Sequence, residues 1–251
     1  MRKRFRLFIL AFLAATLPAW AGPPFLTDDP EPVDYRHFEF YIFQTLNAVG
    51  GNDTVQGPAL EFNWGALPEV QLHVIASLTG ISGGGFGTYG LGDSELGVKF
   101  RFVDETPGFP QVGIFPMAEI PTGDVSRGLG NGLTWYKFPL WIQKSWGPWT
   151  TYGGGGYALN AAAGTRDYPF GGWLIQRDLG GQWTLGGELF AQGQDTDADQ
   201  GFFLVNVGGQ FNFSPGFSLL FSGGHSLVGQ DVTVEYFALY WTWGPEEKRD
   251  K

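Results

Sequence analysis

The stretch GLGDSELGVKFRF, residues 90–102, alternates apolar and polar side chains in its second half. Leucine, valine and two phenylalanines occupy positions 96, 98, 100 and 102, and Glu95, Lys99 and Arg101 occupy positions between or beside them. Successive side chains of a strand point to opposite faces, so the pattern predicts a strand with one apolar and one charged face. In a soluble sheet the apolar face meets a core, whereas in a membrane barrel it meets lipid and the charged face lines a wet interior. The rest of the chain decides between these two environments.

Residues 1–21 have the pattern of a secretory signal peptide. Four Lys and Arg residues precede the apolar run 7–17, and the small residues Ala19 and Ala21 flank Trp20. The alternative, a membrane anchor, needs about 20 apolar residues, which this run does not reach. We expect cleavage between Ala21 and Gly22 and export of the mature chain. No other stretch is long and apolar enough for a spanning helix, and the absence of cysteine excludes a disulfide framework.

The charge balance excludes some partners. The whole chain carries a net charge of -10 from 15 basic and 25 acidic residues. Removal of the four basic residues of the leader leaves 11 basic residues against 25 acidic ones, a net charge of -14. This balance argues against nucleic acid as a partner and against attraction to anionic head groups. The 40 glycines and 17% aromatic residues disfavour helices and suit tight turns and interfacial aromatic belts.

Twelve alternating segments follow, each near the length of about 9–11 residues that a tilted membrane strand needs. They cover residues 37–47, 59–65, 70–77, 90–102, 111–120, 134–144, 149–160, 171–178, 183–192, 202–213, 218–225 and 232–243. In the last segment Phe237, Leu239 and Trp241 alternate with smaller or hydroxyl-bearing side chains, and no charge follows Glu235. Outward faces that end in aromatic residues favour a barrel in lipid over a secreted soluble sandwich or barrel.

The connections alternate in length. Short turns with Pro and Gly follow the even-numbered segments, as in SPG at 214–216, and longer Gly- and Asp-rich connections follow most odd-numbered ones, as in GQDTDADQG at 193–201. Outer-membrane barrels have short periplasmic turns, long external loops and an even strand number. We therefore predict an all-β fold, a transmembrane antiparallel up-and-down β-barrel of about 12 strands. Its parts are a signal peptide at 1–21, a Pro-rich acidic leader or partial plug at 22–36, the barrel at 37–243 and a polar tail at 244–251.

Several whole segments resemble a known family. They are PPFLTDDPEPVDYRHFEFY at 23–41, GPALEFNWGALPEVQLHV at 57–74, the opening stretch, FPMAEIPTGD at 115–124 and PLWIQKSWGPWTTYGGGGY at 139–157. These segments are similar to the outer-membrane family named for the meta-cleavage (MetA) pathway of phenol degradation, whose members are described as transporters. The resemblance implies an outer-membrane barrel that moves aromatic or other small apolar compounds. It transfers no catalytic motif, and the tail after Trp243 departs from the terminal aromatic residue usual in outer-membrane proteins.

Alternation assigns one set of side chains to the lumen, and twelve strands predict a narrow pore because about eight leave room only for side chains. The set mixes charged, amide and aromatic groups, a surface that suits small aromatic solutes with polar edges. These predicted lumen-lining residues are Glu39, Tyr41, Phe43, Glu61, Asn63, Gln71, His73, Glu95, Lys99, Arg101, Phe115, Glu119, Glu188 and Phe190.

The register of the second and third segments follows from the stretch 65–69 between them. If Trp64 pairs with Val70, then Glu61 lies opposite His73. Directly opposed residues have Cβ atoms about 4.5–5.5 Å apart, so the sequence predicts direct contact between this carboxylate and the imidazole.

No chemistry-bearing motif competes with this interpretation. The glycine-rich stretch at 83–97 lacks the Lys-Ser/Thr of a phosphate loop, the acidic stretches lack a calcium ladder, and His73 and Ser77 lie about 13 Å apart on a strand. We expect no catalytic residue, metal or cofactor, and hence no enzyme.

The expected function is passive passage of small solutes, aromatic ones included, through a channel or transporter in the outer membrane of a Gram-negative bacterium. Its expected partners are outer-membrane lipid, the solute and the outer-membrane assembly machinery, without nucleic acid. The alternatives are a structural or adhesive barrel with a closed lumen and an outer-membrane enzyme.

Overall fold

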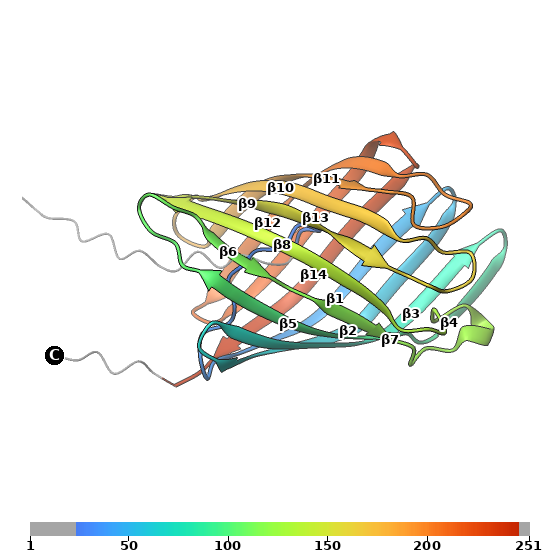
Figure 1. Cartoon of the computed structure of the whole chain (residues 1–251), viewed down its shortest axis with the longest axis horizontal. Helices are drawn as coiled ribbons and strands as arrows, with labels where there is room; N and C mark the ends of the chain where they lie inside the picture. Colours follow the sequence, from blue (N-terminus) through green and yellow to red (C-terminus); the bar gives the residue numbers. More distant parts are fainter. Residues whose placement is uncertain (1–23, 246–251) are drawn as a thin grey trace, which may run out of the picture.

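The computed structural model describes residues 24–245, which form one closed antiparallel β-barrel (Figure 1). The signal peptide and most of the C-terminal tail expected from the sequence lie outside the described residues. Among the residues described, no helix has the length and apolar character that crossing a bilayer requires. The strands are β1 (Phe38–Val49), β2 (Asn52–Leu67), β3 (Val70–Gly83), β4 (Phe86–Leu91), β5 (Ser94–Val103), β6 (Gln111–Ile114), β7 (Met117–Ile120), β8 (Trp135–Trp146), β9 (Trp149–Leu159), β10 (Tyr168–Asp178), β11 (Trp183–Gln192), β12 (Phe202–Ser214), β13 (Phe217–Gly229) and β14 (Val232–Trp243).

These fourteen elements make a wall of twelve strands, which confirms the predicted fold class. β4 and β5 are two parts of one strand, interrupted at Gly92 and Asp93, and β6 and β7 are two parts of another, interrupted at Phe115 and Pro116. Neighbours in sequence pair antiparallel around the wall, and pairing of β1 with β14 closes the barrel.

Prolines explain the interruption between β6 and β7. Pro116 on this strand and Pro139 on β8 have no backbone N–H and so cannot donate to the ladder. The bonds that remain run from Val98 N to the Pro116 carbonyl at 3.0 Å and from Phe115 N to the Pro139 carbonyl at 3.3 Å. The register is kept across the break, but the wall has fewer hydrogen bonds there.

The connections at the end of the barrel opposite Trp243 differ in part from the prediction. The glycine-rich stretches 48–58 and 78–93 were expected to be long loops, but they are mostly strand. Gly50 and Gly51 turn β1 into β2, and Gly84 and Gly85 turn β3 into β4, all four with positive φ. Glycine permits both an extended strand and a left-handed turn, so composition alone could not separate the two. The cyan hairpin of β3 and β4 extends beyond the wall in Figure 1.

Three connections at this end are irregular, namely 121–134, which contains the short 3-10 helix η1 (Val125–Arg127), 160–167 and 193–201. Short turns join strands at the end that carries Trp243, as the sequence predicts, for example Pro68–Glu69 and Pro215–Gly216.

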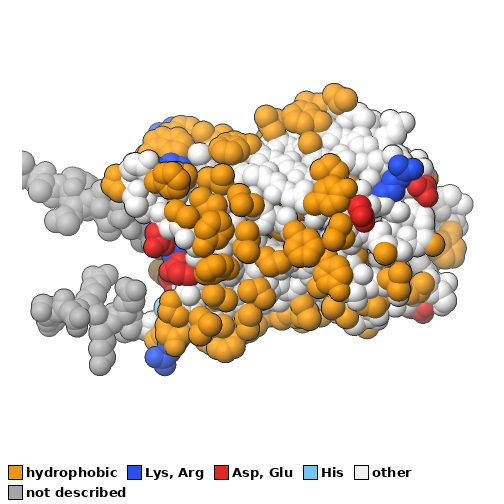
Figure 2. All heavy atoms as spheres, viewed as in Figure 1, with side chains coloured by type: hydrophobic (Ala, Val, Ile, Leu, Met, Phe, Trp, Pro, Cys, Tyr) orange, Lys and Arg blue, Asp and Glu red, His pale blue; other side chains and the backbone are white. Residues whose placement is uncertain are grey.

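The outer surface of the barrel carries an apolar belt. Outward side chains such as Trp173, Leu189 and Phe237 are about half exposed, while their neighbours Leu174, Glu188 and Ala238 are buried. Figure 2 shows hydrophobic side chains crowded over one end and the middle of the wall and sparser toward the other end. This alternation of exposed apolar side chains with buried inward ones gives the wall the apolar outer surface that a barrel needs in lipid.

Candidate functional site: the barrel lumen

The inner face of the wall brings the predicted residues together. All fourteen lie on the face opposite the apolar belt, and twelve of them are buried. The exceptions are Arg101 and Glu119, whose side chains are 22% and 20% exposed.

The buried acids of β1 and β2 are tied together by hydrogen bonds. The hydroxyls of Tyr240 and Tyr41 donate to Glu39 at 2.8 and 2.9 Å. The amide of Asn63 donates to Glu61 at 2.8 Å and to Glu39 at 3.3 Å. Each carboxylate therefore has partners inside the wall, as a buried charge requires.

His73 extends this network across β3 to β5. Its Nδ1 lies 2.7 Å from Asn63 Oδ1, and its Nε2 lies 3.1 Å from Glu95 Oε1. On the other side of Glu95, Lys137 donates from Nζ at 2.9 Å. The same ammonium lies 3.9 Å from Glu119. Both nitrogens of the imidazole are thus occupied within a polar network and do not form a nucleophile–base pair with a serine.

The predicted register between β2 and β3 is wrong by two residues. Trp64 pairs with Leu72 and Glu61 with Ile75, so Asn63, not Glu61, lies opposite His73. The strands continue to Leu67 and Val70 around a two-residue turn, whereas the prediction assumed a turn from 65 to 69. The carboxylate nevertheless reaches the imidazole diagonally, with 3.5 Å between Glu61 Oε1 and His73 Nδ1.

Charge is distributed unevenly around the lumen. The inner face of β1–β8, here the charged wall, carries Glu39, Glu61, His73, Glu95, Lys99, Arg101, Glu119 and Lys137. The inner face of β9–β14, here the neutral wall, is lined by groups such as Leu174, Leu204 and Leu220, and Glu188 is its buried acid within the described residues.

Residues 24–33 lie inside the barrel, between these walls, and the exposed residues 34–36 connect them to β1. In Figure 1 the blue segment before β1 runs within the ring of strands. Its N-terminal part meets the neutral wall. Glu188 accepts from the backbone amides of Leu26, at 3.1 Å, and Thr27, and Ser222 donates to the Pro24 carbonyl at 2.6 Å.

The acids of this segment meet the charged wall. Lys99 Nζ lies 3.0 Å from Asp28 and 3.5 Å from Asp29, and both Lys99 and Asp29 are buried. Lys99 also lies over the ring of Phe115, 5.1 Å from its centroid. These contacts of Lys99 with Asp28 and Asp29 bind the segment to β5, and they are called the clasp below.

Glutamine side chains of the wall bind the rest of the segment. Gln111 and Gln143 donate to Glu31 at 3.3 and 3.1 Å, and the Val33 amide donates to Gln71 at 2.9 Å. The segment is therefore bound by side chains of the wall along its length.

Glycines of the wall make room for the segment. A Cβ at Gly172 would lie 2.1 Å from Thr27 Oγ1, and one at Gly113 would lie 3.0 Å from the Pro30 side chain and from its carbonyl oxygen. At Gly65 a Cβ would lie 1.9 Å from the Asp34 carbonyl oxygen. A side chain at Gly65 or Gly172 would displace the segment, and one at Gly113 would press against both Pro30 and the Phe100 carbonyl of β5.

Sequence reasoning missed several of these lumenal groups. Lys137, Gln111 and Gln143 lie on inward positions of predicted strands, and their alternation with Tyr136 or Ile142 was the signal that could have found them. No local pattern indicated which wall positions the segment 24–36 would contact.

The irregular connections at the far end of the barrel are tied to one another. Asp93 accepts from the amides of Gly123 and Asn131, and the Asn131 side chain donates to Asn160 at 2.9 Å. Arg166 in turn forms an ion pair with Asp197 at 2.8 Å.

Hydrogen bonds also connect these loops to the β13–β14 and β1–β2 turns. Gln230 N donates to Gly201 O, and Gly50 N donates to Asp231 O. Within loop 121–134, hydrogen bonds from Ser126 lower the pKa of the Asp124 carboxyl, which caps η1. The connections form one rim around the opening.

Comparison with known proteins supports the fold. No protein-family model matches the sequence, and comparison with curated proteins gives no match. Among solved structures, the chain is similar to the COG4313 outer membrane channel from Pseudomonas putida F1, with a TM-score of 0.67 and 12% identity over 86% of this chain and 98% of that one. It is also similar to the NanC porin, with a TM-score of 0.56 and 7% identity over 80% and 98% of the two chains. A third similar structure is the translocator domain of the autotransporter NalP from Neisseria meningitidis, with a TM-score of 0.53 and 9% identity over 84% and 89%. At these identities the likeness concerns the fold alone: this chain has the architecture of an outer-membrane β-barrel.

Proposed function

We propose that the protein is an outer-membrane channel for passive passage of small solutes, with residues 24–36 as a partial plug of its lumen. The observation that carries this proposal is the binding of that segment. It contributes no strand to the sheet and is held by side chains, so it can move without opening the wall. The channel architecture of similar solved structures is consistent with this function.

The lumen surface favours neutral or weakly cationic solutes over anions. The four acids of the charged wall are matched by Lys99, Arg101, Lys137 and the imidazole of His73, and Asp28, Asp29 and Glu31 of the segment give the lumen an excess of acid. Aromatic rings such as Phe43 and Phe190 lie on the same inner face. Small aromatic compounds with a polar edge can stack on such rings and hydrogen-bond to the amides and carboxylates. This solute class also agrees with the family resemblance of the sequence.

Planar-bilayer recordings test the proposal. Wild-type protein should give small discrete conductance steps, and a variant lacking residues 24–34 should give larger ones, because the segment no longer fills the lumen. Both proteins should fractionate with the outer membrane and migrate faster unboiled than boiled, which shows that the barrel is closed. Silence of both folded proteins would overturn the channel proposal.

The filled lumen also favours a second candidate, a structural or adhesive barrel with a permanently closed lumen. The hydrogen-bonded loops around the opening would then be the functional surface. This candidate requires that removal of the segment leaves the bilayer silent and that changes in the loop 193–201 alter adhesion.

A further inference from the structure

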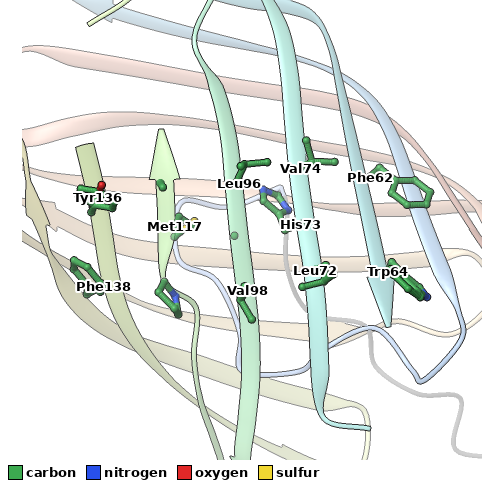
Figure 3. A pocket seen from close by; sticks show the side chains of 13 residues that line it. Phe62, Trp64, Leu72, His73, Val74, Leu96, Val98, Met117, Tyr136 and Phe138 are labelled. Carbon is green, nitrogen blue, oxygen red and sulfur yellow. The ribbon is translucent and has the colours of Figure 1, made fainter. Parts of the chain in front are cut away.

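The outer surface of the wall has a hollow where β6 and β7 are interrupted. Its volume is about 560 Å³, within the roughly 300–1,000 Å³ typical of small-molecule sites. Figure 3 shows its lining side chains on adjacent strands, with Phe62 and Trp64 at one side and Tyr136 and Phe138 at the other.

Strand pairing explains why the surface is hollow at this place. One row of outward residues runs across five strands as Phe62, Val74, Leu96, Ala118 and Tyr136, each paired with the next. All its members except Ala118 have large side chains. The surface therefore drops at Ala118, between Leu96 and Tyr136.

A parallel row has the same dip. It runs from Trp64 through Leu72 and Val98 to Pro116 and then Phe138. The compact ring of Pro116 is the low point of this row. The two low points are two residues apart on one strand, so together they make a groove along that strand.

The lining is mainly apolar, and three of its residues, His73, Gly97 and Met117, occupy inward positions of their strands. Of its residues, Tyr136, Trp64 and His73 carry polar side-chain atoms, and none is Asp, Glu, Lys or Arg. Leu96 and Val98 at its edge are 48% and 40% exposed, as in the rest of the belt. A groove with few polar atoms and without Asp, Glu, Lys or Arg fits a flexible hydrocarbon chain better than a head group or a polar solute.

We propose that this groove binds one acyl chain of a membrane lipid. The occupant follows from continuity, because the groove is part of the apolar belt and opens toward the bilayer that the belt contacts. A chain lying between Leu96 and Tyr136 contacts side chains on both sides and the proline ring beneath. Over neighbouring outward rows of large side chains an acyl chain would touch one side only, so this position holds it longer than those neighbours.

Photo-crosslinking in vesicles tests this inference. The protein is reconstituted in phosphatidylethanolamine vesicles that contain a trace of the same lipid with a diazirine on one acyl chain. Mass spectrometry then locates the crosslinked residues. We expect labelling to concentrate on residues 96–98 and 116–118, about fivefold above the outward residues 185–189 of β11.

Filling the groove should remove the preference. Ala118→Phe should lower labelling of residues 96–98 about fivefold, and Ala191→Phe, at an exposed position of β11, should leave it unchanged. Val98→Trp is a second filling variant if Ala118→Phe does not give a heat-modifiable barrel. Uniform labelling along the belt, or no effect of either filling variant, would overturn the inference. If a filling variant left lipid labelling unchanged but reduced solute uptake, that result would also overturn the inference. It would assign the groove to the solute.

Discussion

The two halves of the inner wall bind the lumenal segment in different ways. The charged wall binds mainly the acidic side chains of the segment, with Lys99 contacting Asp28 and Asp29, and it binds one backbone amide, that of Val33, through Gln71. The neutral wall binds it through its backbone, with Glu188 accepting from two consecutive amides. The charged wall also links its own strands through paired acids and bases, whereas both walls make space with glycine, at Gly65 and Gly113 on the charged wall and at Gly172 on the neutral wall. The charged wall therefore recognises the acidic side chains of the segment, and the neutral wall holds the backbone of its N-terminal part in place.

The largest effect is expected from the clasp on the charged wall. Lys99→Met leaves Asp29 buried without its cation, and loss of one partner of a buried pair costs about 3–5 kcal/mol. The chain has no cysteine, so Val33→Cys, at a buried position of the segment, is a specific reporter. Maleimide labelling of this cysteine should become more than about a hundredfold faster in Lys99→Met. Lys144→Met, which removes an ion pair with Glu105 near the turn, is the matched control and should label at the parent rate.

Glu188→Gln tests the neutral wall in the same assay. The substitution keeps the shape of the side chain but removes the charge that accepts from Leu26 and Thr27. Hydrogen bonds to charged groups contribute about 1.5–3 kcal/mol, so labelling at residue 33 should rise by about tenfold to a hundredfold. If Glu188→Gln raised the labelling rate more than Lys99→Met does, the neutral wall would be the one that holds the segment more strongly.

A smaller effect is expected from the glycine that makes room on the neutral wall. Gly172→Ala places a methyl group against Thr27 and the Leu189 carbonyl, and overpacking of this kind costs about 1–3 kcal/mol. Gly187→Ala is the control, because its nearest atom, the Asn206 carbonyl oxygen, is 3.8 Å away. Equal labelling rates in the two alanine variants would show that the segment is not seated against Gly172.

The smallest expected effect concerns ion selectivity. Glu61→Gln removes one acid from the charged wall and should lower cation preference about twofold in reversal-potential measurements on the variant without residues 24–34. Asn206→Asp adds an acid to the neutral wall and should raise the preference by a similar factor. Unchanged reversal potentials in both would mean that the fixed charges do not line the conducting path.

Alternation alone was sufficient to predict twelve strands and the inward side of each. The period of two reports which face a residue such as Glu95 or Phe190 occupies, because that face is fixed by the backbone. It does not report which residue lies opposite, so the register of Glu61 and His73 was wrong. The glycine-rich stretches were misread because glycine suits both strands and loops. The sequence left the place of residues 24–36 open, since their partners lie on strands distant in the chain.

The contacts among the loops around the opening limit the positions at which a foreign sequence can be inserted into this barrel. An epitope tag in the connection 193–201 would pull on the connection at 160–167 through Arg166 and on the last hairpin through Gly201. The turn at Gly84 and Gly85 has no such neighbours, because a Cβ at either glycine would meet no atom within 4 Å. A tag there would report the orientation of the barrel in the membrane without loosening the other connections, and it is the position from which a display scaffold could be built.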